Sequence, residues 1–212
     1  MKLVLATNNH DKVKEIKTYL SSLSWEIIGA FELPNAPDVV EDQATLRGNA
    51  LKKAREIAEV AGTWTLADDT GLFVTALKGR PGVYSARYAG SKASYLENVQ
   101  KLLQEMKSVP AGKRAAEFVC VMALVHSDGR EVVVESRLVG EITTEPKGKS
   151  GFGYDPVFWL PQQKKTLAEL TLEEKNQISH RGQSLYKMKS VLETIIKIPS
   201  PLRGEGEGEG EN

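Results

Sequence analysis

Two long strand-like segments joined by a short polar turn constrain the fold of this chain most strongly. The segments are residues 116–126 and 131–142, and Ser127-Asp128-Gly129-Arg130 lies between them. An Asp-Gly pair between two strand-like segments is a strong signal for a β-hairpin, because both residues tolerate the positive φ of tight hairpin turns. The chain is therefore predicted to contain a long antiparallel strand pair, around which the other elements must pack.

Shorter segments, predicted to be strands and helices, precede and follow this hairpin in the sequence. Short apolar runs predict buried strands, and apolar side chains at helical spacing predict amphipathic helices. The predicted strands are residues 2–6 and 64–67, and the predicted helices are residues 13–23, 45–61, 95–106 and 184–196, with a further short helix capped by Thr171 and Glu174. Interleaved helices and strands with one antiparallel pair predict an α/β fold with a mixed β-sheet.

Two of these helices carry specific predictions about burial. In the first, Val13 and Ile16 share an inward face, which leaves Glu15 among the polar side chains on the rest of the helix. In the third, Tyr95 and Leu96 belong to the apolar set of an amphipathic helix.

The composition excludes several classes of protein. Among 212 residues, 28 are Lys or Arg and 28 are Asp or Glu, so the formal net charge is zero. This balance argues against a nucleic-acid partner, because neutralising phosphates needs a basic surplus or a basic face. Cys120 is the sole cysteine, which excludes an intrachain disulfide framework and a cysteine-based zinc site. No apolar run is long enough for a signal peptide or a membrane span, so we expect a cytoplasmic protein without a membrane partner.

The end of the sequence differs from the rest. Residues 199–212 contain two prolines and then alternate glycine with glutamate. A segment with so few apolar side chains cannot form a core, so it is predicted to be a disordered tail. Residues 1–198 are expected to form one domain.

The polar turn Thr7-Asn8-Asn9 connects the first predicted strand to the first predicted helix. Free backbone N–H groups and the positive end of the helix dipole favour an anion such as phosphate there. Lys12, in the first helical turn, adds a mobile positive charge. The alternative is a plain N-cap, because asparagine before a helix commonly accepts from its first N–H groups.

Two adjacent carboxylates, Asp68 and Asp69, follow the apolar run 64–67. Neighbouring carboxylates repel each other, and burial raises their pKa values unless a cation or donors compensate. Magnesium prefers carboxylate oxygens together with water and substrate phosphates, so it fits this pair. Successive side chains of a strand point to opposite faces, so one carboxylate is expected to serve the site while the other assists. The alternative is an Asp-Asp-Thr-Gly turn without function.

Two further positions extend this candidate site. Glu41 and Asp42 lie in the acidic loop 29–43 and are the expected third carboxylates. Lys53 lies close to the apolar stripe of the helix 45–61, from which it can reach a phosphate beside Glu41. The alternative for Lys53 is a side chain that extends to solvent.

Two segments carry side chains suited to a planar base. Gly151-Phe152-Gly153-Tyr154-Asp155-Pro156 offers aromatic rings for stacking, a carboxylate that accepts from ring N–H groups, and glycines that permit close backbone approach. Ser179-His180-Arg181 offers donors for carbonyl oxygens on a base. The alternatives are a turn with aromatic core anchors and a solvated helix start.

The sequence contains neither a motif for covalent catalysis nor a P-loop for nucleotide binding. There is no Gly-x-Ser-x-Gly pattern, and Gly148-Lys149-Ser150 is preceded by Thr143 at the position where a P-loop requires its first glycine. The three histidines lack the spacing of metal ligands. A water activated by a metal ion is the chemistry that these residues leave open.

Taken together, six segments resemble the XTP/dITP diphosphatase family, also called the inosine triphosphate pyrophosphatases. The resemblance covers residues 2 to 196. Its segments are residues 6–15, 48–54, 67–72, 81–88, 151–158 and 174–182, which include Ala6-Thr7-Asn8-Asn9, Gly48-Asn49-Ala50, Ala67-Asp68-Asp69-Thr70-Gly71, Pro81-Gly82-Val83-Tyr84-Ser85-Ala86-Arg87 and Ser179-His180-Arg181-Gly182.

The resemblance implies a fold, a reaction and partners. The fold is a long mixed β-sheet with helical lobes that flank a central active-site cleft. The reaction is hydrolysis of inosine, xanthosine and deoxyinosine triphosphates to the monophosphate and pyrophosphate, with Mg²⁺ as cofactor and a homodimer as the expected assembly. The alternative function is a purine-nucleotide-binding module without turnover, which the crowding of carboxylates near phosphates disfavours.

The resemblance also implies roles for individual residues. Glu41 and Asp69 would bind magnesium, with Asp69 as the proton acceptor and Asp68 in support. The substrate-binding residues would be Thr7, Asn8, Asn9, Lys12 and Lys53 for the triphosphate, Phe152, Gly153, Tyr154, Asp155, Lys175, His180 and Arg181 for the purine, and Thr70 as a further contact. Donors from the last three purine-binding residues suit a 6-oxo group, and an exocyclic amine would leave them unpaired.

Overall fold

The computed structural model describes residues 1–197. The predicted tail, residues 199–212, and the domain boundary before it lie outside the described residues and stay predictions. The strands are β1 (Lys2–Leu5), β2 (Glu26–Gly29), β3 (Trp64–Val74), β4 (Pro81–Gly82), β5 (Ala115–Val125), β6 (Glu131–Ile142), β7 (Phe158–Leu160) and β8 (Lys165–Thr166). The α-helices are α1 (His10–Tyr19), α2 (Leu46–Ala61), α3 (Tyr95–Glu105), α4 (Leu172–Ile178) and α5 (His180–Lys197).

The strands form one mixed sheet in the order β2-β1-β3-β5-β6-β7-β8, with β4 paired to β3. β1 is parallel to β2 and β3, whereas the other pairs are antiparallel. The predicted hairpin is confirmed, because β5 and β6 pair from Val125 opposite Glu131 to Ala115 opposite Glu141. The predicted α/β fold with a mixed sheet is therefore confirmed.

The central strand β3 is longer than predicted. The sequence indicated a strand that ends before Asp68, but β3 runs through both aspartates and on to Val74. Asp68 pairs with Met122 of β5, and Asp69 pairs with Val121. The interpretation of these aspartates as a turn is therefore wrong, because the backbone of β3 stays paired with β5 through both residues. Their polar side chains are typical of a turn, but their backbone is not in one.

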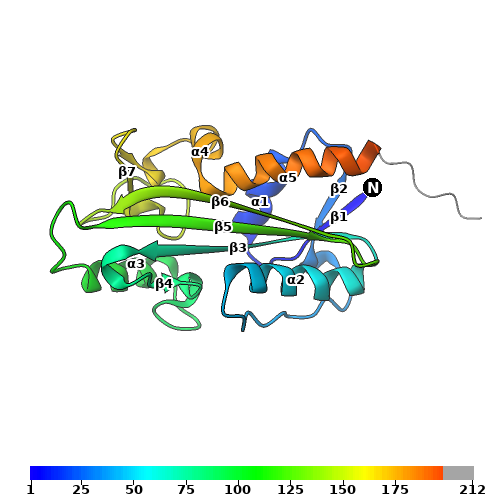
Figure 1. Ribbon diagram of the computed structural model, residues 1–212, viewed down its shortest axis with the longest axis horizontal. Helices are drawn as coiled ribbons and strands as arrows, with labels where there is room; N and C mark the ends of the chain where they lie inside the picture. The colour runs from blue at the N-terminus through cyan, green and yellow to red at the C-terminus, as the bar shows by residue number, and fades with distance from the viewer. Residues whose placement is uncertain (198–212) are drawn as a thin grey trace, which may run out of the picture.

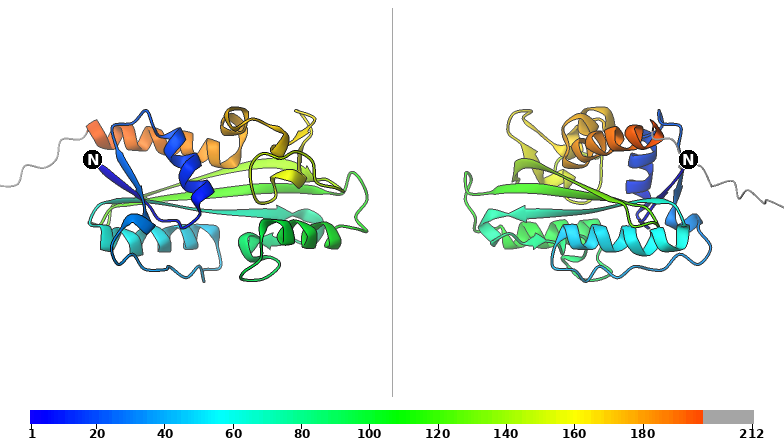
Figure 2. Two further views of the ribbon diagram at one scale, coloured as in Figure 1. Left: turned by 180° about the vertical axis from the view of Figure 1, so that it is seen from behind. Right: turned by 45° about the vertical axis from the view of Figure 1, so that its right-hand side comes forward.

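Helices cover both faces of the sheet (Figures 1 and 2). α1, α4 and α5 lie on one face, and α2 and α3 lie on the other. Alternate residues of the strands supply the two cores: Leu66 packs in the cluster that contains α1 and α5 side chains, and Ala67 packs in the cluster that contains α2 side chains. A third cluster, around Phe158, packs α3 against the far end of the sheet. The next two residues of β3, Asp68 and Asp69, continue this alternation between faces.

The ends of the helices follow local capping chemistry. Thr45 caps α2, and Gly62 closes it in the left-handed conformation with φ of 63°, in agreement with the predicted bounds. The predicted capping box before α4 is also present. α5 begins at His180 rather than at the predicted residue 184, because the Ser179 hydroxyl accepts from Gly182 N over 3.0 Å and starts the helix there.

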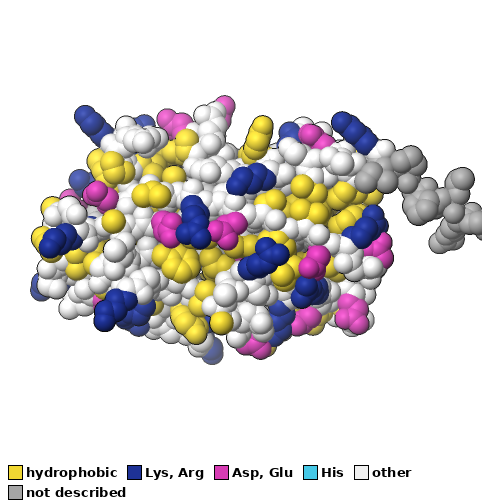
Figure 3. Space-filling model, viewed as in Figure 1, with side chains coloured by type: hydrophobic (Ala, Val, Ile, Leu, Met, Phe, Trp, Pro, Cys, Tyr) yellow, Lys and Arg dark blue, Asp and Glu magenta, His cyan; other side chains and the backbone are white. Residues whose placement is uncertain are grey.

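The surface carries charges of both signs. On the face shown in Figure 3, Lys and Arg side chains are interspersed with Asp and Glu, as the zero net charge leads one to expect. None of the helices within residues 1–197 combines the length and the apolar character needed to cross a membrane.

Candidate active site

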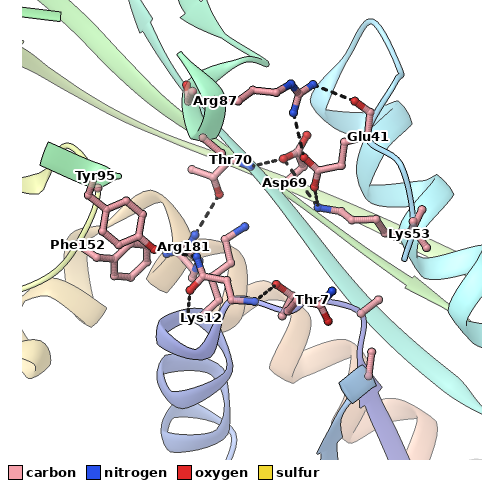
Figure 4. A pocket seen from close by; sticks show the side chains of 18 of the residues that line it. Thr7, Lys12, Glu41, Lys53, Asp69, Thr70, Arg87, Tyr95, Phe152 and Arg181 are labelled. Carbon is pink, nitrogen blue, oxygen red and sulfur yellow. Dashed lines mark hydrogen bonds and ion pairs between the residues drawn. The ribbon is translucent and has the colours of Figure 1, made fainter. Parts of the chain in front are cut away.

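A cavity of about 460 Å³ lies beside β3, where the N-terminal turn, the loop before α2, the segment around Phe152 and the start of α5 meet (Figure 4). It brings together all of the sequence-predicted site residues except Asp68 and Asp42, although they come from segments far apart in the chain. Its lining includes Thr7, Asn8, Asn9, Lys12, Glu41, Lys53, Asp69, Thr70, Phe152, Gly153, Tyr154, Asp155, Lys175, His180 and Arg181.

Asp68 lies beneath the cavity on the face of β3 that α1 and α5 cover. Its Oδ2 is 3.0 Å from Lys12 Nζ and 3.1 Å from Arg181 Nη2, and it accepts from the Thr70 hydroxyl over 3.2 Å. Burial alone would raise the pKa of Asp68, but Lys12 and Arg181 hold it well below its usual range. Asp68 is therefore a permanently ionised anchor for two cations.

Asp69 faces the cavity on the opposite side of the strand. Its Oδ2 accepts from Asn49 Nδ2 over 3.0 Å, and its Oδ1 accepts from Thr70 N over 3.1 Å. Burial raises the pKa of Asp69 above its usual range; Lys53 opposes this shift, and the charge of Glu41 adds to it. The two adjacent aspartates thus lie on opposite faces of β3, as the strand alternation predicted, and their pKa values shift in opposite directions.

Glu41 and Lys53 form an ion pair at one end of the cavity (Figure 4). Lys53 Nζ also donates to the backbone oxygen of Asp68 over 2.8 Å and lies 3.9 Å from Asp69 Oδ1. With only 8% of its surface exposed, Lys53 does not extend to solvent, so that alternative is wrong. Burial would raise the pKa of Glu41, but Lys53, Lys12 and Arg87 together hold it below its usual value.

The other acidic residue of this loop points elsewhere. Asp42 pairs with Lys52 at the surface over 2.8 Å, and it does not line the cavity. Arg87, which was not among the predicted site residues, donates from Nη2 to the Glu41 backbone oxygen over 2.8 Å and lies 3.4 Å from the Glu41 carboxylate. Of the two predicted third carboxylates, Glu41 is the one at the site.

The N-terminal turn combines both interpretations considered from the sequence. Asn9 is the N-cap of α1, and its Oδ1 accepts from Asp11 N over 3.0 Å and from Lys12 N over 3.2 Å. The capping interpretation is therefore confirmed. Thr7, Asn8 and Asn9 nevertheless line the cavity, so the cap also presents this turn to a ligand.

Phe152 and two buried cations form the opposite end of the cavity. Lys175 Nζ lies 4.8 Å from the centre of the Phe152 ring, and Arg181 Cζ lies 5.3 Å from it. Asp155 Oδ2 accepts from Lys175 Nζ over 2.9 Å and from Phe152 N over 3.0 Å. This end therefore offers an aromatic ring backed by positive charge.

The glycines and Tyr154 of this segment serve its internal geometry. Gly151 has φ of 75°, and a Cβ there would lie 2.1 Å from Asp155 Oδ2. Tyr154 donates from its hydroxyl to Ser85 O over 2.8 Å and is 5% exposed. Tyr154 therefore anchors the segment to the core, while Phe152 is the ring beside the two cations.

His180 is a neutral imidazole at the cavity wall. Its ring stacks on Phe118 at 4.4 Å with an interplanar angle of 17°. Burial lowers the pKa of His180 well below its usual value, and Arg181 lowers it further. Within residues 1–197, His180 Nδ1 has no hydrogen-bond partner. A buried polar atom beside a cavity is suited to bind a ligand.

Glu15 supports the cations of the site from a position that the helical pattern placed at the surface. It was expected on the polar side of α1, but it is 4% exposed. Its Oε1 lies 3.3 Å from Lys175 Nζ, and its Oε2 accepts from Arg181 Nη1 over 2.9 Å. Hydrophobic periodicity gives no signal for this position, because its burial depends on cations far along the chain.

Three other residues beside the site were not predicted to belong to it. Asn49 lies in the Gly48-Asn49-Ala50 segment and Arg87 in the segment 81–88, and neither received a role. Tyr95 was counted as a helix core residue, but it lines the cavity and is 42% exposed. Leu96, also expected inward, is 62% exposed, so that prediction is wrong.

Comparisons with known proteins agree with this geometry. The model of the Ham1 family matches residues 3–191. A dITP/XTP pyrophosphatase from Desulforamulus reducens is 47% identical over 195 residues, which cover 92% of this chain and 97% of the relative. One from Thermoanaerobacter pseudethanolicus is 46% identical over 192 residues, which cover 91% and 96%.

Solved structures give the same result. The structure of a HAM1 protein from Coxiella burnetii has a TM-score of 0.84 and 41% identity, and the match covers 92% of this chain and 99% of that chain. The Staphylococcus aureus Ham1 protein has a TM-score of 0.82 and 38% identity, with 92% and 100% covered.

Proposed function

Because the chain belongs to the Ham1 family, we propose that its cavity cleaves non-standard purine nucleoside triphosphates with Asp69 as the proton acceptor. The chain is a nucleoside-triphosphate diphosphatase, which releases the monophosphate and pyrophosphate. Relatives that are 46–47% identical over more than nine-tenths of this chain are named dITP/XTP pyrophosphatases. Nucleotide binding without turnover is therefore set aside.

Asp68 and Asp69 lie in different environments, and we assign their roles on this difference. A general base must reach the attacking water and bind its proton, so a carboxylate with a raised pKa beside the cavity suits the task. Asp69 lines the cavity, and burial raises its pKa. Asp68 is paired with Lys12 and Arg181 below the cavity. We assign the proton transfer to Asp69 and the positioning of the two cations to Asp68.

The lysines support binding of the triphosphate between them. Lys12 reaches the cavity from α1 and Lys53 from α2. Each lysine is paired with a carboxylate, and a bound phosphate can draw the lysine away from that partner. The start of α1 adds backbone N–H groups and the helix dipole. Thr7, Asn8 and Asn9 place this turn against the same space.

The residues present fit a magnesium ion together with the substrate. Within residues 1–197, no group of three or more His, Cys, Asp or Glu side chains is placed to hold a metal ion. Glu41 and Asp69 nevertheless flank Lys53, and magnesium commonly takes one or two carboxylates with water and substrate phosphates as its remaining ligands. When bound, it would neutralise charge on the phosphates.

The purine end suits a base with a 6-oxo group. Lys175, His180 and Arg181 line this end, and the buried His180 Nδ1 has no hydrogen-bond partner in the part of the chain that the structure describes. A site built from donors rejects an analogue that leaves those donors unpaired, as the amine of adenine would. Phe152 supplies a ring on which the purine can stack.

We further propose a homodimer that works in the cytoplasm and binds neither nucleic acid nor membranes. The mixed surface charge supports the absence of a polyanionic partner. Light scattering of the purified chain measures the assembly: a mass twice that of one chain is expected, and a monomer would contradict the proposal.

Pyrophosphate release from ITP, XTP, dITP, GTP and ATP tests the proposed function, with and without magnesium. Metal-dependent turnover of the first three is expected, with GTP and ATP much slower. Asp69→Asn is expected to lose several orders of magnitude in rate, whereas the surface variant Asp128→Asn serves as a control for the same chemical change. Equal rates on ITP and GTP would contradict the specificity, and an active Asp69→Asn would contradict the mechanism.

A further inference from the structure

Tyr95 connects the two ends of the cavity (Figure 4). Its ring centre lies 5.8 Å from that of Phe152, with the ring planes 32° apart. Its hydroxyl accepts from Asn9 Nδ2 over 2.9 Å. Phe152 belongs to the proposed purine end, and Asn9 belongs to the turn at the proposed phosphate end. One side chain thus touches both parts of the site.

The backbone holds Tyr95 firmly in this place. Tyr95 is the first residue of α3, directly after the N-cap Ser94. Ser94 N donates to Glu97 Oε2 over 2.7 Å, and Glu97 N donates to Ser94 Oγ over 3.3 Å, which completes a capping box. The aromatic side chain therefore projects from a fixed helical turn and not from a mobile loop.

The hydroxyl bond keeps the ring over the cavity. Asn9 uses its Oδ1 to cap α1, so its amide orientation is fixed and its Nδ2 points to Tyr95. The Tyr95 hydroxyl also lies 3.5 Å from Asp11 Oδ2, to which it can donate while its oxygen accepts from Asn9. A tyrosine held in this way loses little further freedom when a ligand packs against it.

Tyr95 remains partly exposed beside the cavity. Tyr95 is 42% exposed although it lines the cavity, and Phe152 already packs against Lys175 and Arg181. Exposed aromatic surface inside a concave site is typical of surface that a ligand buries. The ring of Tyr95 extends the aromatic surface of Phe152 on the side of the N-terminal turn.

From these contacts, and resting on the function proposed above, we infer that Tyr95 is a further substrate-binding residue of this enzyme. Its ring and that of Phe152 form one aromatic wall for the purine, and its hydroxyl bond to Asn9 fixes the wall relative to the phosphate end. The ligand class is a purine nucleotide, and the contribution is to the base rather than to the phosphates.

The test compares the ring and the hydroxyl separately. Tyr95→Leu removes both, Tyr95→Phe removes the hydroxyl alone, and Tyr186→Leu and Tyr186→Phe repeat these changes at an exposed tyrosine of α5 outside the cavity. Titration calorimetry without metal measures the Kd of inosine monophosphate, which carries the base, and of inorganic tripolyphosphate, which does not. Pyrophosphate release from ITP gives KM and kcat.

A base-binding role predicts a selective loss. Tyr95→Leu should weaken inosine monophosphate binding and raise KM about tenfold, the size expected for one base–aromatic contact, while tripolyphosphate binding stays at the wild-type level. Tyr95→Phe should show a smaller loss, and both Tyr186 variants should match the wild type.

Two results would overturn this inference. One is unchanged inosine monophosphate binding in Tyr95→Leu, and the other is an equal weakening of both probes, which would mark a structural effect through the N-terminal turn. If the wild type releases no pyrophosphate from ITP, the proposed function fails, and the two binding measurements still decide the role of Tyr95.

Discussion

Glu15 of the first helix and Arg181 of the last helix form a buried ion pair, in which Arg181 Nη1 donates to Glu15 Oε2 over 2.9 Å. Glu15 also lies 3.3 Å from Lys175, and Arg181 also lies 3.1 Å from Asp68. One carboxylate that the helical pattern placed at the surface thus neutralises two cations beneath the purine end of the cavity.

Glu15→Gln is expected to destabilise the fold and weaken purine binding. The change leaves Lys175 and Arg181 with one carboxylate fewer, and breaking a buried ion pair by removing one partner costs roughly 3–5 kcal/mol. Urea denaturation measures this loss. Glu131→Gln, which removes the partner of Arg55 at the surface, is the control and should lose less than about 1 kcal/mol. Equal losses of unfolding free energy in the two variants would show that the burial of Glu15 does not add to the stability of the fold.

Asp68→Asn is expected to change how stability depends on pH. The pKa of Asp68 lies below its usual value of 3.8 in the folded protein, so its ionised form stabilises the fold above that value, and the contribution is lost as the pH falls toward the folded pKa. The wild type should therefore be much more stable than the variant at pH 7, and the difference should shrink below about pH 5. Denaturation at several pH values checks this, and a difference that stays constant with pH would contradict it.

Asp69→Asn is expected to separate stability from activity. The pKa of Asp69 is raised by burial, so the ionised form opposes folding once the pH rises above its unfolded pKa. The variant should be at least as stable as the wild type at pH 7, while its rate falls by roughly 10²–10⁴ for loss of a general base. Thermal unfolding and pyrophosphate release measure the two effects. A loss of stability like that of Asp68→Asn would place both aspartates in the same structural role.

Lys53→Met and Lys52→Met are expected to differ sharply. Lys53 is buried between Glu41 and the backbone oxygen of Asp68, whereas the neighbouring Lys52 pairs with Asp42 at the surface. Lys53→Met should raise KM for ITP and lower inhibition by tripolyphosphate, because a phosphate ligand is lost. Lys52→Met should leave both near the wild type. Similar effects of the two changes would argue against a phosphate-binding role for Lys53.

Gly151→Ala is expected to disturb the purine end more than Gly129→Ala disturbs its turn. Both glycines have positive φ, 75° and 92°, so both substitutions strain the backbone. At Gly151 the added Cβ would also lie 2.1 Å from Asp155 Oδ2, whereas nothing lies within 4 Å at Gly129. Kd values for inosine monophosphate should rise in Gly151→Ala only, and matching values in both variants would contradict the role of Asp155 in placing Lys175.

Local signals in the sequence predicted much of the fold. Thr45 and Gly62 fixed the bounds of α2, and the Asp128-Gly129 turn fixed the register of the longest strand pair. Short strands such as β7, with three residues, were not predicted, because their pairing is supplied by neighbours and not by their own pattern.

The site was predictable where a residue type is unusual for its position. Asp68 and Asp69 beside an apolar strand, and Lys53 beside an apolar stripe, were selected on that ground, and the structure brings Asp69 and Lys53 to one cavity. Glu15 and Tyr95 look ordinary in a helix pattern. Their surroundings come from distant segments, so only the folded chain reveals them.

The link between α1 and α5 has a consequence for biosynthesis. A ribosome that has completed β6 has already made the carboxylates of β3 together with Lys12 and Lys53, but Arg181 has not yet been synthesised. The charges of Glu15 and Asp68 then lack a partner that each has in the finished protein. The buried ion pairs that join α1 and β3 to Arg181 therefore form only after the start of α5 has been translated.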